Sequence, residues 1–281
     1  MTQIAILYIC IGDYSVFWEE FYKSFEEKFL VNAQKNYYVF TDKTSIYGEK
    51  DNHKIHKIYQ ENLGWPGNTL FRYKMFLQIV SELKEYDYVF FMNANIICVS
   101  EIVEKEFLPE KEKLLVVQHP GYYNSQPYEF PYERRRVSSA YIPYLKGDVY
   151  VCGGVNGGKA KDFIKLIEIL ARRIETEFAK GTIAKWHDES HINRYVLDNS
   201  DYRLLSPSYC YPENSTIPFE PKLVVLEKKN WLKLDSDKVK RQEEKVSLSG
   251  RIKIKLRNRT FKLLYQFKGE KWRTRHQEKR N

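Results

Sequence analysis

An apolar stretch that ends in two asparagines constrains the fold more than any other segment of this chain. Residues 86–92, YDYVFFM, have the composition of a buried strand, and Asn93-Ala94-Asn95 follows directly. Because ligands bind beyond the carboxyl ends of the strands in open α/β sheets, this position predicts that Asn93 and Asn95 face a binding site. Asparagine is also frequent in turns that follow strands, so the pair gains its weight from the larger pattern.

Strand and helix patterns alternate along the rest of the chain, which predicts a mixed α/β sheet wound around a cleft. Strands are expected at residues 4–11, 37–41, 54–59, 88–92, 114–118, 149–152, 203–205 and 223–226. Helices are expected at residues 68–83, 161–178 and 189–197, and four phenylalanines spaced four apart between residues 17 and 29 suit the face of another helix. Residues 119–146 form a long connection rich in Pro, Tyr and Ser, and in a compact domain such a connection usually has a function.

The basic residues are concentrated toward the C-terminus. The chain of 281 residues has a formal net charge of +9, and residues 238–281 hold 16 Lys or Arg against 4 Asp or Glu. We therefore expect one large domain over residues 1–237 and a basic extension over residues 238–281. The extension can be a solvated tail, or it can be attracted to an anionic membrane or an acidic, lipid-linked glycan carrier. The chain has no nucleic-acid recognition motif, so no nucleic-acid partner is expected.

The first residues and the cysteines favour a cytoplasmic protein. Residues 1–7, MTQIAIL, enter a strand pattern without the successive basic, apolar and small-residue regions of a signal peptide. No run approaches the roughly 20 apolar residues of a membrane span. The scattered cysteines show no Cys-x-x-Cys spacing and are expected to be buried, reduced thiols: Cys10, Cys98, Cys152 and Cys210.

Residues 186–191, WHDESH, combine an aromatic ring, two carboxylates and two histidines. His187 and His191 are four residues apart, so on a helix they share a face that suits zinc. However, Asp188 follows the first histidine where the metalloprotease pattern has glutamate, and no third ligand is evident, so we expect no metal there. The segment is compatible with a polar site beside an aromatic wall, which suits a sugar, and equally with a helix N-terminus whose acidic residues favour the dipole.

Residues 153–158, GGVNGG, match neither the P-loop nor the dinucleotide-binding pattern, since Lys159 is followed by Ala160. One interpretation is a tight turn between a strand and a helix. The other is an exposed backbone against which a sugar ring lies, because no side chains intervene.

Together these segments resemble glycosyltransferase family 6, the family of the blood group A and B transferases. The matches occur in the family's order and are residues 37–42 (YYVFTD), 119–123 (HPGYY), 132–135 (YERR), 140–143 (AYIP) and 186–190 (WHDES). Many nucleotide-sugar enzymes hold a divalent metal with Asp-x-Asp, but the amides of Asn93 and Asn95 bring no charge to bind a hard cation. This Asn-x-Asn form resembles the family's bacterial branch, which is regarded as metal-independent.

The resemblance covers roughly residues 1–230 and implies a fold and an activity. The implied fold is α/β, a GT-A type single Rossmann-like nucleotide-sugar domain with a mixed, mainly parallel sheet. The implied reaction is a retaining transfer of GalNAc or Gal from UDP-GalNAc or UDP-Gal to the 3-hydroxyl of a galactose, often one that carries α1,2-linked fucose. The implied location is the bacterial cytoplasm, with possible peripheral contact at the inner face of the membrane.

The resemblance also implies roles for the residues that match the family's motifs. Glu189 is the expected catalytic carboxylate, either as a nucleophile toward the anomeric carbon or as a partner for its developing positive charge. Donor-binding roles fall on Ile9, Ile11, Tyr14, Arg72, Asn93, Asn95, Cys152, Gly153, Gly154, Asp188 and Lys229. Acceptor-binding roles fall on His119, Trp186 and Glu189. No metal or other cofactor is expected, so lysine and arginine must offset the charge on the leaving UDP.

Two residues bear on substrate identity. Pro131 stands where the family has an acceptor-contacting threonine, and it has no hydroxyl, which leaves the acceptor open. Gly154 leaves room for an N-acetyl group and so favours UDP-GalNAc, although a roomy pocket also admits galactose. The alternatives are a UDP-Gal-dependent α1,3-galactosyltransferase, a glycan-binding protein that kept the fold and lost catalysis, and a protein that acts mainly through its basic tail.

Overall fold

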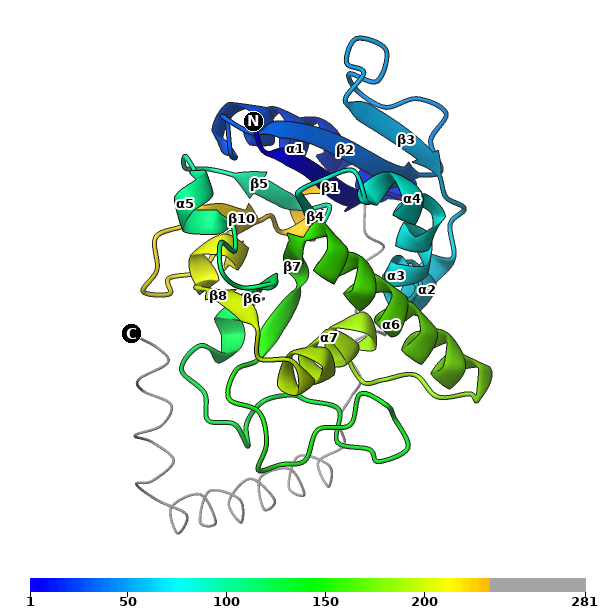
Figure 1. Ribbon diagram of the computed structural model, residues 1–281, viewed down its shortest axis with the longest axis vertical. Helices are drawn as coiled ribbons and strands as arrows, with labels where there is room; N and C mark the ends of the chain where they lie inside the picture. Colours follow the sequence, from blue (N-terminus) through cyan, green and yellow to red (C-terminus); the bar gives the residue numbers. More distant parts are fainter. Residues whose placement is uncertain (233–281) are drawn as a thin grey trace.

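A seven-stranded sheet forms the centre of the molecule (Figure 1). The structure, a computed structural model, describes residues 1–232. The strand order is β3-β2-β1-β4-β7-β6-β8. The strands are β1 (Gln3–Ile9), β2 (Gln34–Thr41), β3 (Ile55–Tyr59), β4 (Tyr88–Met92), β6 (Leu114–Gln118), β7 (Val151–Lys159) and β8 (Tyr202–Leu205). Only β7 runs antiparallel to its neighbours, β4 and β6, whereas the other pairs are parallel, which confirms the predicted mixed, mainly parallel sheet.

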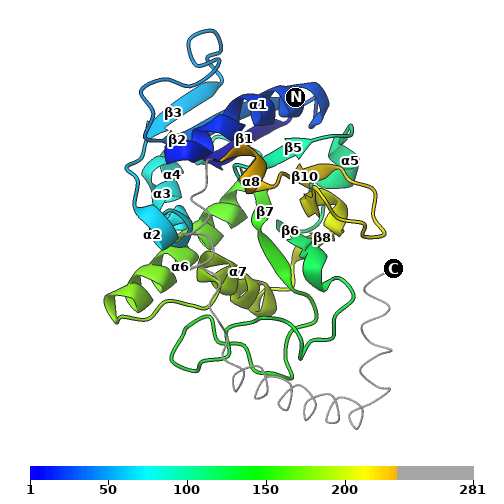
Figure 2. The same ribbon diagram turned by 180° about the vertical axis from the view of Figure 1, so that it is seen from behind.

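Helices cover both faces of this sheet. Figure 1 shows α6 and α7 in front of it, and Figure 2, seen from behind, shows α1 on the opposite face. A small sheet in the order β5-β10-β9 lies on the α1 side. The helices are α1 (Trp18–Lys28), α2 (Gly64–Leu70), α3 (Arg72–Phe76), α4 (Val80–Leu83), α5 (Glu104–Phe107), α6 (Ala160–Ala179), α7 (His187–Asp198) and α8 (Lys228–Trp231). The small strands are β5 (Ile96–Cys98), β9 (Tyr211–Pro212) and β10 (Leu223–Val225), and short 3-10 turns are η1 (Gly12–Phe17), η2 (Leu77–Ile79), η3 (Pro120–Tyr122) and η4 (Pro207–Cys210).

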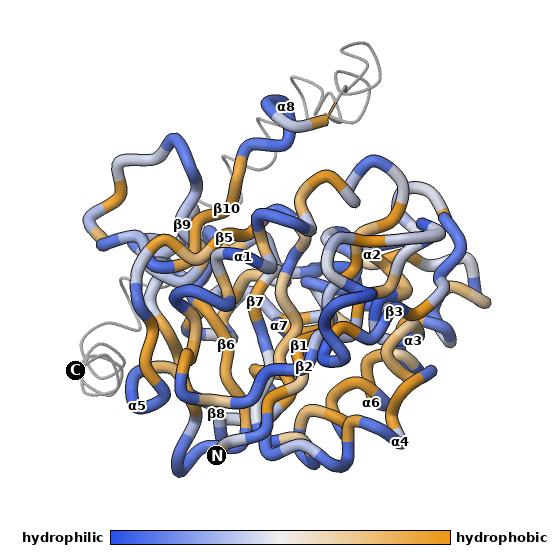
Figure 3. Tube along the Cα trace, turned by 90° about the horizontal axis from the view of Figure 1, so that it is seen from above, coloured by the Kyte–Doolittle hydropathy of each residue, from blue (hydrophilic) through white to orange (hydrophobic). Residues whose placement is uncertain are grey.

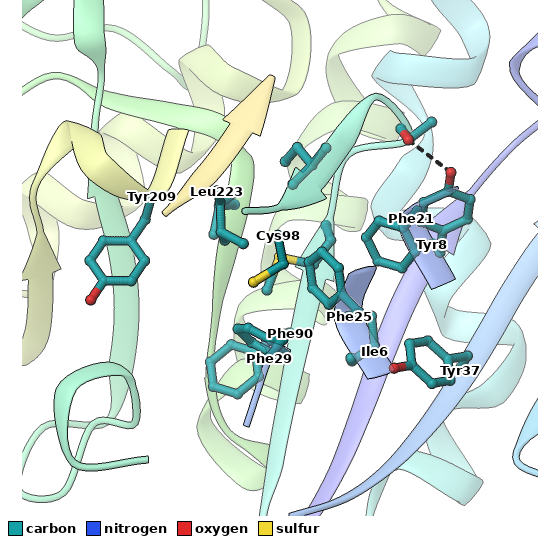
Figure 4. Close-up of a cluster of buried hydrophobic side chains, with 14 of the residues drawn as sticks. Ile6, Tyr8, Phe21, Phe25, Phe29, Tyr37, Phe90, Cys98, Tyr209 and Leu223 are labelled. Carbon is teal, nitrogen blue, oxygen red and sulfur yellow. Dashed lines mark hydrogen bonds between the residues drawn. The ribbon is translucent and has the colours of Figure 1, made fainter. Parts of the chain in front are cut away.

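The central strands are apolar on both faces because both faces are packed. In β1, Ile4, Ile6 and Tyr8 join the cluster that contains the α1 phenylalanines, whereas Ala5 and Leu7 join the cluster under α3, α4 and α6. Strands buried on both sides have continuous apolar sequences rather than alternating ones, which explains why β1 and β4 are evident in the sequence. Figure 4 shows the α1 side of this core, where Tyr8 Oη donates a 2.8 Å hydrogen bond to Ala94 O and so anchors the segment after β4.

The structure corrects the prediction of one continuous helix over residues 68–83. Phe71 and Ile79 leave the helical region of backbone conformation, with ψ angles of 17° and 19°, so the segment divides into α2, α3, η2 and α4. The break at Phe71 begins α3 at Arg72, whose side chain is buried. At the start of α2 the backbone is also irregular, with Gly64 at a φ of +65° and Trp65 extended.

A second correction concerns residues 153–158, which form no turn but continue β7 as far as Lys159. The need for glycine there comes from packing between strands. A Cβ at Gly157 would lie 2.4 Å from Val89 O, and one at Gly158 would lie 2.4 Å from Lys113 O. Such contacts are impossible, so only glycine lets β7 approach its neighbours this closely.

Two further expectations concern the long connection and the tail. Residues 119–150 join β6 to β7 with only the short turn η3 as regular structure, as the sequence predicts. None of the helices between residues 1 and 232 combines the length and apolarity that a membrane crossing requires. The extension predicted over residues 238–281 lies outside the described residues.

Candidate active site

The polar residues singled out in the sequence gather where β4 ends and β7 begins. Because β7 is antiparallel to β4, its first residues lie beside the carboxyl end of β4, and Asn93 N donates a 2.8 Å hydrogen bond to Gly154 O. Figure 3 views this arrangement from above. The strands β1 and β7 lie inside the molecule, and α8 lies on the side opposite the N-terminus. The site therefore lies at the strand end at which open α/β sheets bind ligands.

A buried ion pair forms one wall. Arg72 Nη1 donates a 2.8 Å hydrogen bond to Gly153 O, and Arg72 Nε lies 3.1 Å from Asp188 Oδ2. The guanidinium also stacks over the Phe91 ring, 4.4 Å from its centroid. Asp188 is 1% exposed, and this burial raises its pKa to about 7, with the guanidinium of Arg72 opposing the rise and the charge of Glu189 adding to it.

One oxygen of Asp188 is available to a ligand. Asp188 Oδ2 is buried and forms the ion pair with Arg72 Nε, but no residue between 1 and 232 donates a well-aligned hydrogen bond to it. It lies 3.3 Å from the point that a Cβ on Gly153 would occupy, so it faces the space that glycine leaves open. A ligand hydroxyl placed over Gly153 would add a hydrogen-bond donor to this oxygen.

The carboxylate of Glu189 accepts two hydrogen bonds, one from Tyr150, which directly precedes β7, and one from Gly153 within β7. Tyr150 Oη donates to Glu189 Oε1 at 2.6 Å, and Gly153 N donates to Glu189 Oε2 at 2.8 Å. Burial and the charge of Glu189 raise the pKa of Tyr150, so its hydroxyl remains a donor. The carboxylate is half-buried in the first turn of α7. It is thus held beside the Gly153-Gly154 backbone, where it can attack an electrophilic carbon or stabilise a positive charge.

Asn193 joins the helix of this carboxylate to the strand beneath it. Its amide exchanges two hydrogen bonds with the backbone of Val151, each 2.9 Å long, and Asn193 Nδ2 also donates to Glu189 O at 2.8 Å. Asn193 is 2% exposed, so these bonds are protected from water. They fix the register between α7 and β7, and therefore the distance between Glu189 and Gly153.

The side chains of the asparagine pair form hydrogen bonds within the protein. Asn93 Nδ2 donates to Asn95 Oδ1 at 2.8 Å, and Asn95 Nδ2 donates to Leu226 O at 2.7 Å. Neither side chain carries a charge, and the Oδ1 of Asn95 already accepts from its neighbour. Over residues 1–232, no group of three or more His, Cys, Asp or Glu side chains is arranged to hold a metal ion.

Comparisons with known proteins show the family to which the chain belongs. The model of glycosyltransferase family 6 matches residues 1–240. The chain belongs to glycosyltransferase family 6. It is 40% identical over 225 residues to the O-antigen biosynthesis glycosyltransferase WbnI of Escherichia coli, a match that covers 80% of this chain and 94% of that protein. Membership of the family makes the chain a glycosyltransferase, and the GT-A-like fold agrees with it.

Vertebrate members of family 6 are also similar. The globoside alpha-1,3-N-acetylgalactosaminyltransferase 1 of Gallus gallus is 30% identical over 223 residues, which cover 77% of this chain and 64% of that protein. The histo-blood group ABO system transferase 1 of Rattus norvegicus is 30% identical over 217 residues, which cover 75% of this chain and 62% of that protein. The chain thus spans slightly less than two thirds of these two longer proteins.

The other residues with expected donor roles lie at the ends of strands around the same edge. Ile9 ends β1, Ile11 is buried just beyond it, and Tyr14 lies in η1, where Lys228 Nζ is 5.2 Å from the centroid of its ring. Cys152 is 3% exposed in β7. Lys229 is exposed on α8 and pairs with Glu227 at 2.6 Å. Their donor-binding roles stay predictions.

The residues with expected acceptor roles lie on the other side of Glu189. His119 directly follows β6, and its ring centroid is 5.6 Å from that of Tyr150, which donates to Glu189. Burial lowers the pKa of His119, which favours its neutral form. Trp186 immediately precedes α7 and is 45% exposed, so its indole ring is available for contact. These acceptor-binding roles also stay predictions.

Sequence reasoning did not identify three residues that shape the site, namely Tyr150, Asn156 and Asn193. Asn156 is fully buried, and its Nδ2 donates to Gly153 O at 3.0 Å, beside the hydrogen bond from Arg72. Asn193 carried a signal, because it follows Glu189 by four residues and lies on the same helix face. Tyr150 and Asn156 carried none, since their roles depend on how β7 lies against α7.

Proposed function

We propose that this enzyme is a retaining glycosyltransferase that moves GalNAc, or Gal, from a UDP-sugar in α1,3 linkage to a galactose-containing, fucosylated acceptor glycan, without a metal. The observation that carries the proposal is the carboxylate of Glu189, which Tyr150 and Gly153 hold beside an open glycine backbone. Retention requires a carboxylate on the face of the sugar opposite the leaving group, either as a nucleophile or as a partner for positive charge. Both routes use the same residue in the same position.

The surroundings of Glu189 support a donor sugar in this space. Asp188 Oδ2 is a buried oxygen that pairs with Arg72 Nε and faces Gly153, where a sugar hydroxyl would give it a further hydrogen-bond donor. The relatives in chicken and rat are named for N-acetylgalactosamine transfer and for the ABO blood group. Among residues 1–232, a Cβ at Gly154 would lie within 4 Å of Asn93 Cβ alone, at 3.5 Å, so we infer that the glycine leaves room for an N-acetyl group. This space favours UDP-GalNAc as the donor.

Charge on the leaving diphosphate would be offset by lysine and arginine rather than by a metal. Asn93 and Asn95 bring no negative charge to this edge of the sheet. Lys228 and Lys229 lie on α8, and Lys228 is already over the Tyr14 ring. A positive side chain near the diphosphate stabilises the charge that develops as its bond to the sugar breaks.

Donor turnover in the presence of a chelator tests the proposal. The full chain would be incubated with UDP-GalNAc or UDP-Gal and 2′-fucosyllactose in excess EDTA, and the product would be detected by mass spectrometry. We expect transfer in EDTA, with UDP-GalNAc preferred. Transfer that requires added manganese would refute the metal-free reaction, and a lack of UDP binding by calorimetry would refute the donor class.

A pair of glutamate variants separates an enzyme from a glycan-binding protein of the same fold. Glu189→Gln keeps the shape of the side chain but removes its charge, so it should abolish transfer and preserve UDP binding. Glu19→Gln is the matched control on the exposed side of α1, where Glu19 pairs with Lys23, and it should retain full activity. Turnover by Glu189→Gln would contradict the assigned role.

A further inference from the structure

Asn95 is connected to the C-terminal part of the described chain. Its Nδ2 donates to Leu226 O at 2.7 Å, and Leu226 N donates to Asn95 O at 2.7 Å. The other polar atom of the Asn95 side chain, Oδ1, accepts a 2.8 Å hydrogen bond from Asn93 Nδ2. Asn95 is 2% exposed and Leu226 is 6% exposed, so water does not compete for these bonds. We call these three hydrogen bonds the Asn95 latch.

The latch lies directly before the segment that carries two lysines. Leu226 is the last buried residue before α8, and Lys228, Lys229 and Trp231 are exposed. Beyond the latch, the segment is held by Glu227 N, which donates to Glu213 Oε2 at 2.6 Å, and by the Trp231 ring, whose centroid is 5.5 Å from that of Phe17. The two backbone-directed bonds of Asn95 thus continue the pairing of β10 with β5 and join the start of this segment to the residues after β4.

An aspartate could not form this latch. A carbonyl oxygen accepts hydrogen bonds, and an amide Nδ2 can donate one, whereas an ionised carboxylate only accepts. With Asp at position 95, a charged oxygen would lie against Leu226 O at the position of the present 2.7 Å bond. The arrangement would then lose a hydrogen bond and bury an unpaired charge. The amide is thus required by its partner and is not simply a carboxylate without charge.

We propose that Asn95 is a positioning residue that holds α8 against the end of β4 and so places Lys229 at the donor diphosphate. This inference rests on the proposed function, and it replaces the direct donor contact expected for Asn95 from the sequence. Both polar atoms of the Asn95 amide are already used within the protein. Asn93 differs, because its Oδ1 accepts no hydrogen bond from the part of the chain that the structure describes, and its Cβ lies 3.5 Å from the point that a Cβ on Gly154 would occupy.

The proposal gives the Asn-x-Asn segment a physical role. Where two aspartates would attract a metal ion, one asparagine instead fixes the segment that carries the replacing positive charge. The cation is then supplied by the chain, and its position depends on a side-chain amide more than 130 residues earlier in the sequence. Loss of the latch should therefore weaken the interaction of Lys229 with the diphosphate and leave the hydrogen bonds to Glu189 intact.

A double-mutant cycle on the full chain tests this coupling, with UDP affinity measured by calorimetry in EDTA. We expect Asn95→Asp and Lys229→Ala each to weaken UDP binding by about tenfold or more, the scale of one charge-assisted hydrogen bond. Because Asn95 acts through Lys229, the double variant should bind UDP within about twofold of the weaker single variant. Effects that multiply, to about a hundredfold, would show that the two residues act independently and would overturn the proposal.

Hydrogen exchange at residues 223–232 gives a readout that does not depend on the donor. Asn95→Asp should accelerate amide exchange at Leu226 and through α8, whereas unchanged exchange would overturn the latch. Asn199→Asp is the matched control, because Asn199 Nδ2 makes the same kind of bond to Tyr195 O, at 2.9 Å, at the end of α7. It should change neither exchange at residues 223–232 nor UDP affinity.

Two further outcomes separate the latch from the proposed function. If Asn95→Asp lacks a cooperative thermal transition, Asn95→Ala removes the donor without burying a charge and should give the same exchange pattern. If the wild-type protein does not bind UDP, the proposed function fails together with the role assigned to Lys229. Exchange in Asn95→Ala then decides whether Asn95 holds α8.

Discussion

Replacing Gly154 with alanine tests the donor pocket with the smallest possible change. A Cβ built at Gly154 would lie 3.5 Å from Asn93 Cβ, which is ordinary van der Waals contact, and no other atom lies within 4 Å. The backbone at Gly154 has no positive φ that would disfavour alanine. Gly154→Ala should therefore fold normally, with a stability change within about 0.5 kcal/mol, and place one methyl group in the space proposed for the donor sugar.

The methyl group should discriminate between the two donors. One methyl or methylene in a snug pocket changes relative transition-state binding by about 1–3 kcal/mol, which is roughly 10- to 200-fold in relative kcat/KM. Because an acetamido group is larger than a hydroxyl, kcat/KM for UDP-GalNAc should fall by that factor, whereas the value for UDP-Gal should change by less than about threefold. Initial rates with 2′-fucosyllactose and each donor, together with a thermal melt, measure both effects.

Two other glycines of β7 provide the comparison. A Cβ at Gly153 would lie 3.3 Å from both Asp188 Oδ2 and Glu189 Cβ, so Gly153→Ala should impair both donors alike. A Cβ at Gly157 would lie 2.3 Å from the Phe90 ring, so Gly157→Ala should prevent normal folding. Equal losses with UDP-GalNAc and UDP-Gal in Gly154→Ala would refute the placement of the N-acetyl group over Gly154.

Three other predictions follow from contacts around the site. Tyr150→Phe removes a donor to Glu189, and since hydrogen bonds to charged groups contribute about 1.5–3 kcal/mol, initial rates should fall about 10- to 100-fold with calorimetric UDP affinity unchanged; unchanged rates would contradict this. Glu133→Gln removes the charge of a buried carboxylate that accepts a 2.8 Å hydrogen bond from Lys185 N, next to Trp186. It should raise the acceptor KM but not the donor KM in steady-state assays, and a rise in the donor KM alone would contradict it. Burial lowers the pKa of His191 to about 4, so the unfolded chain binds more protons below pH 6.5 and the wild type should lose up to about 3 kcal/mol of unfolding free energy by pH 4. His191→Gln should lose less in urea titrations across that range, and equal losses would show that other groups are responsible.

The sequence predicted the strands well where burial alone determines them. The expected strands at residues 88–92 and 114–118 match β4 and β6 residue for residue, because both are short apolar runs in the middle of the sheet. It predicted the region of α2 to α4 less well. Helical periodicity was correctly recognised, but the break at Phe71, which begins the short helix of Arg72, is a property of the packed structure and not of local propensity.

The sequence predicted Asp188 and Glu189 through a family motif, but it did not predict what holds them. Tyr150 reaches Glu189 across 39 residues of sequence, and Asn193 reaches Val151 across 42. Both contacts exist only once β7 has inserted between β4 and β6 and α7 has packed on it. Glycine in a sequence indicates a turn more readily than a close approach between strands, so the sequence of residues 153–158 is also compatible with a turn.

The reversed direction of β7 explains why one short segment can do so much in this site. A parallel strand beside β4 would contribute its last residues to this edge, and its backbone would already be leaving the sheet. Because β7 is antiparallel, it enters the sheet at the functional edge, where Val151 pairs with Gln118 of β6 and Gly154 O accepts the hydrogen bond from Asn93 N. Gly153 can then use its N–H for Glu189 and its carbonyl for Arg72 and Asn156. The same rigid peptide thus fixes the proposed nucleophile and the buried Arg72–Asp188 pair, so a change on either side of Gly153 should be felt on the other.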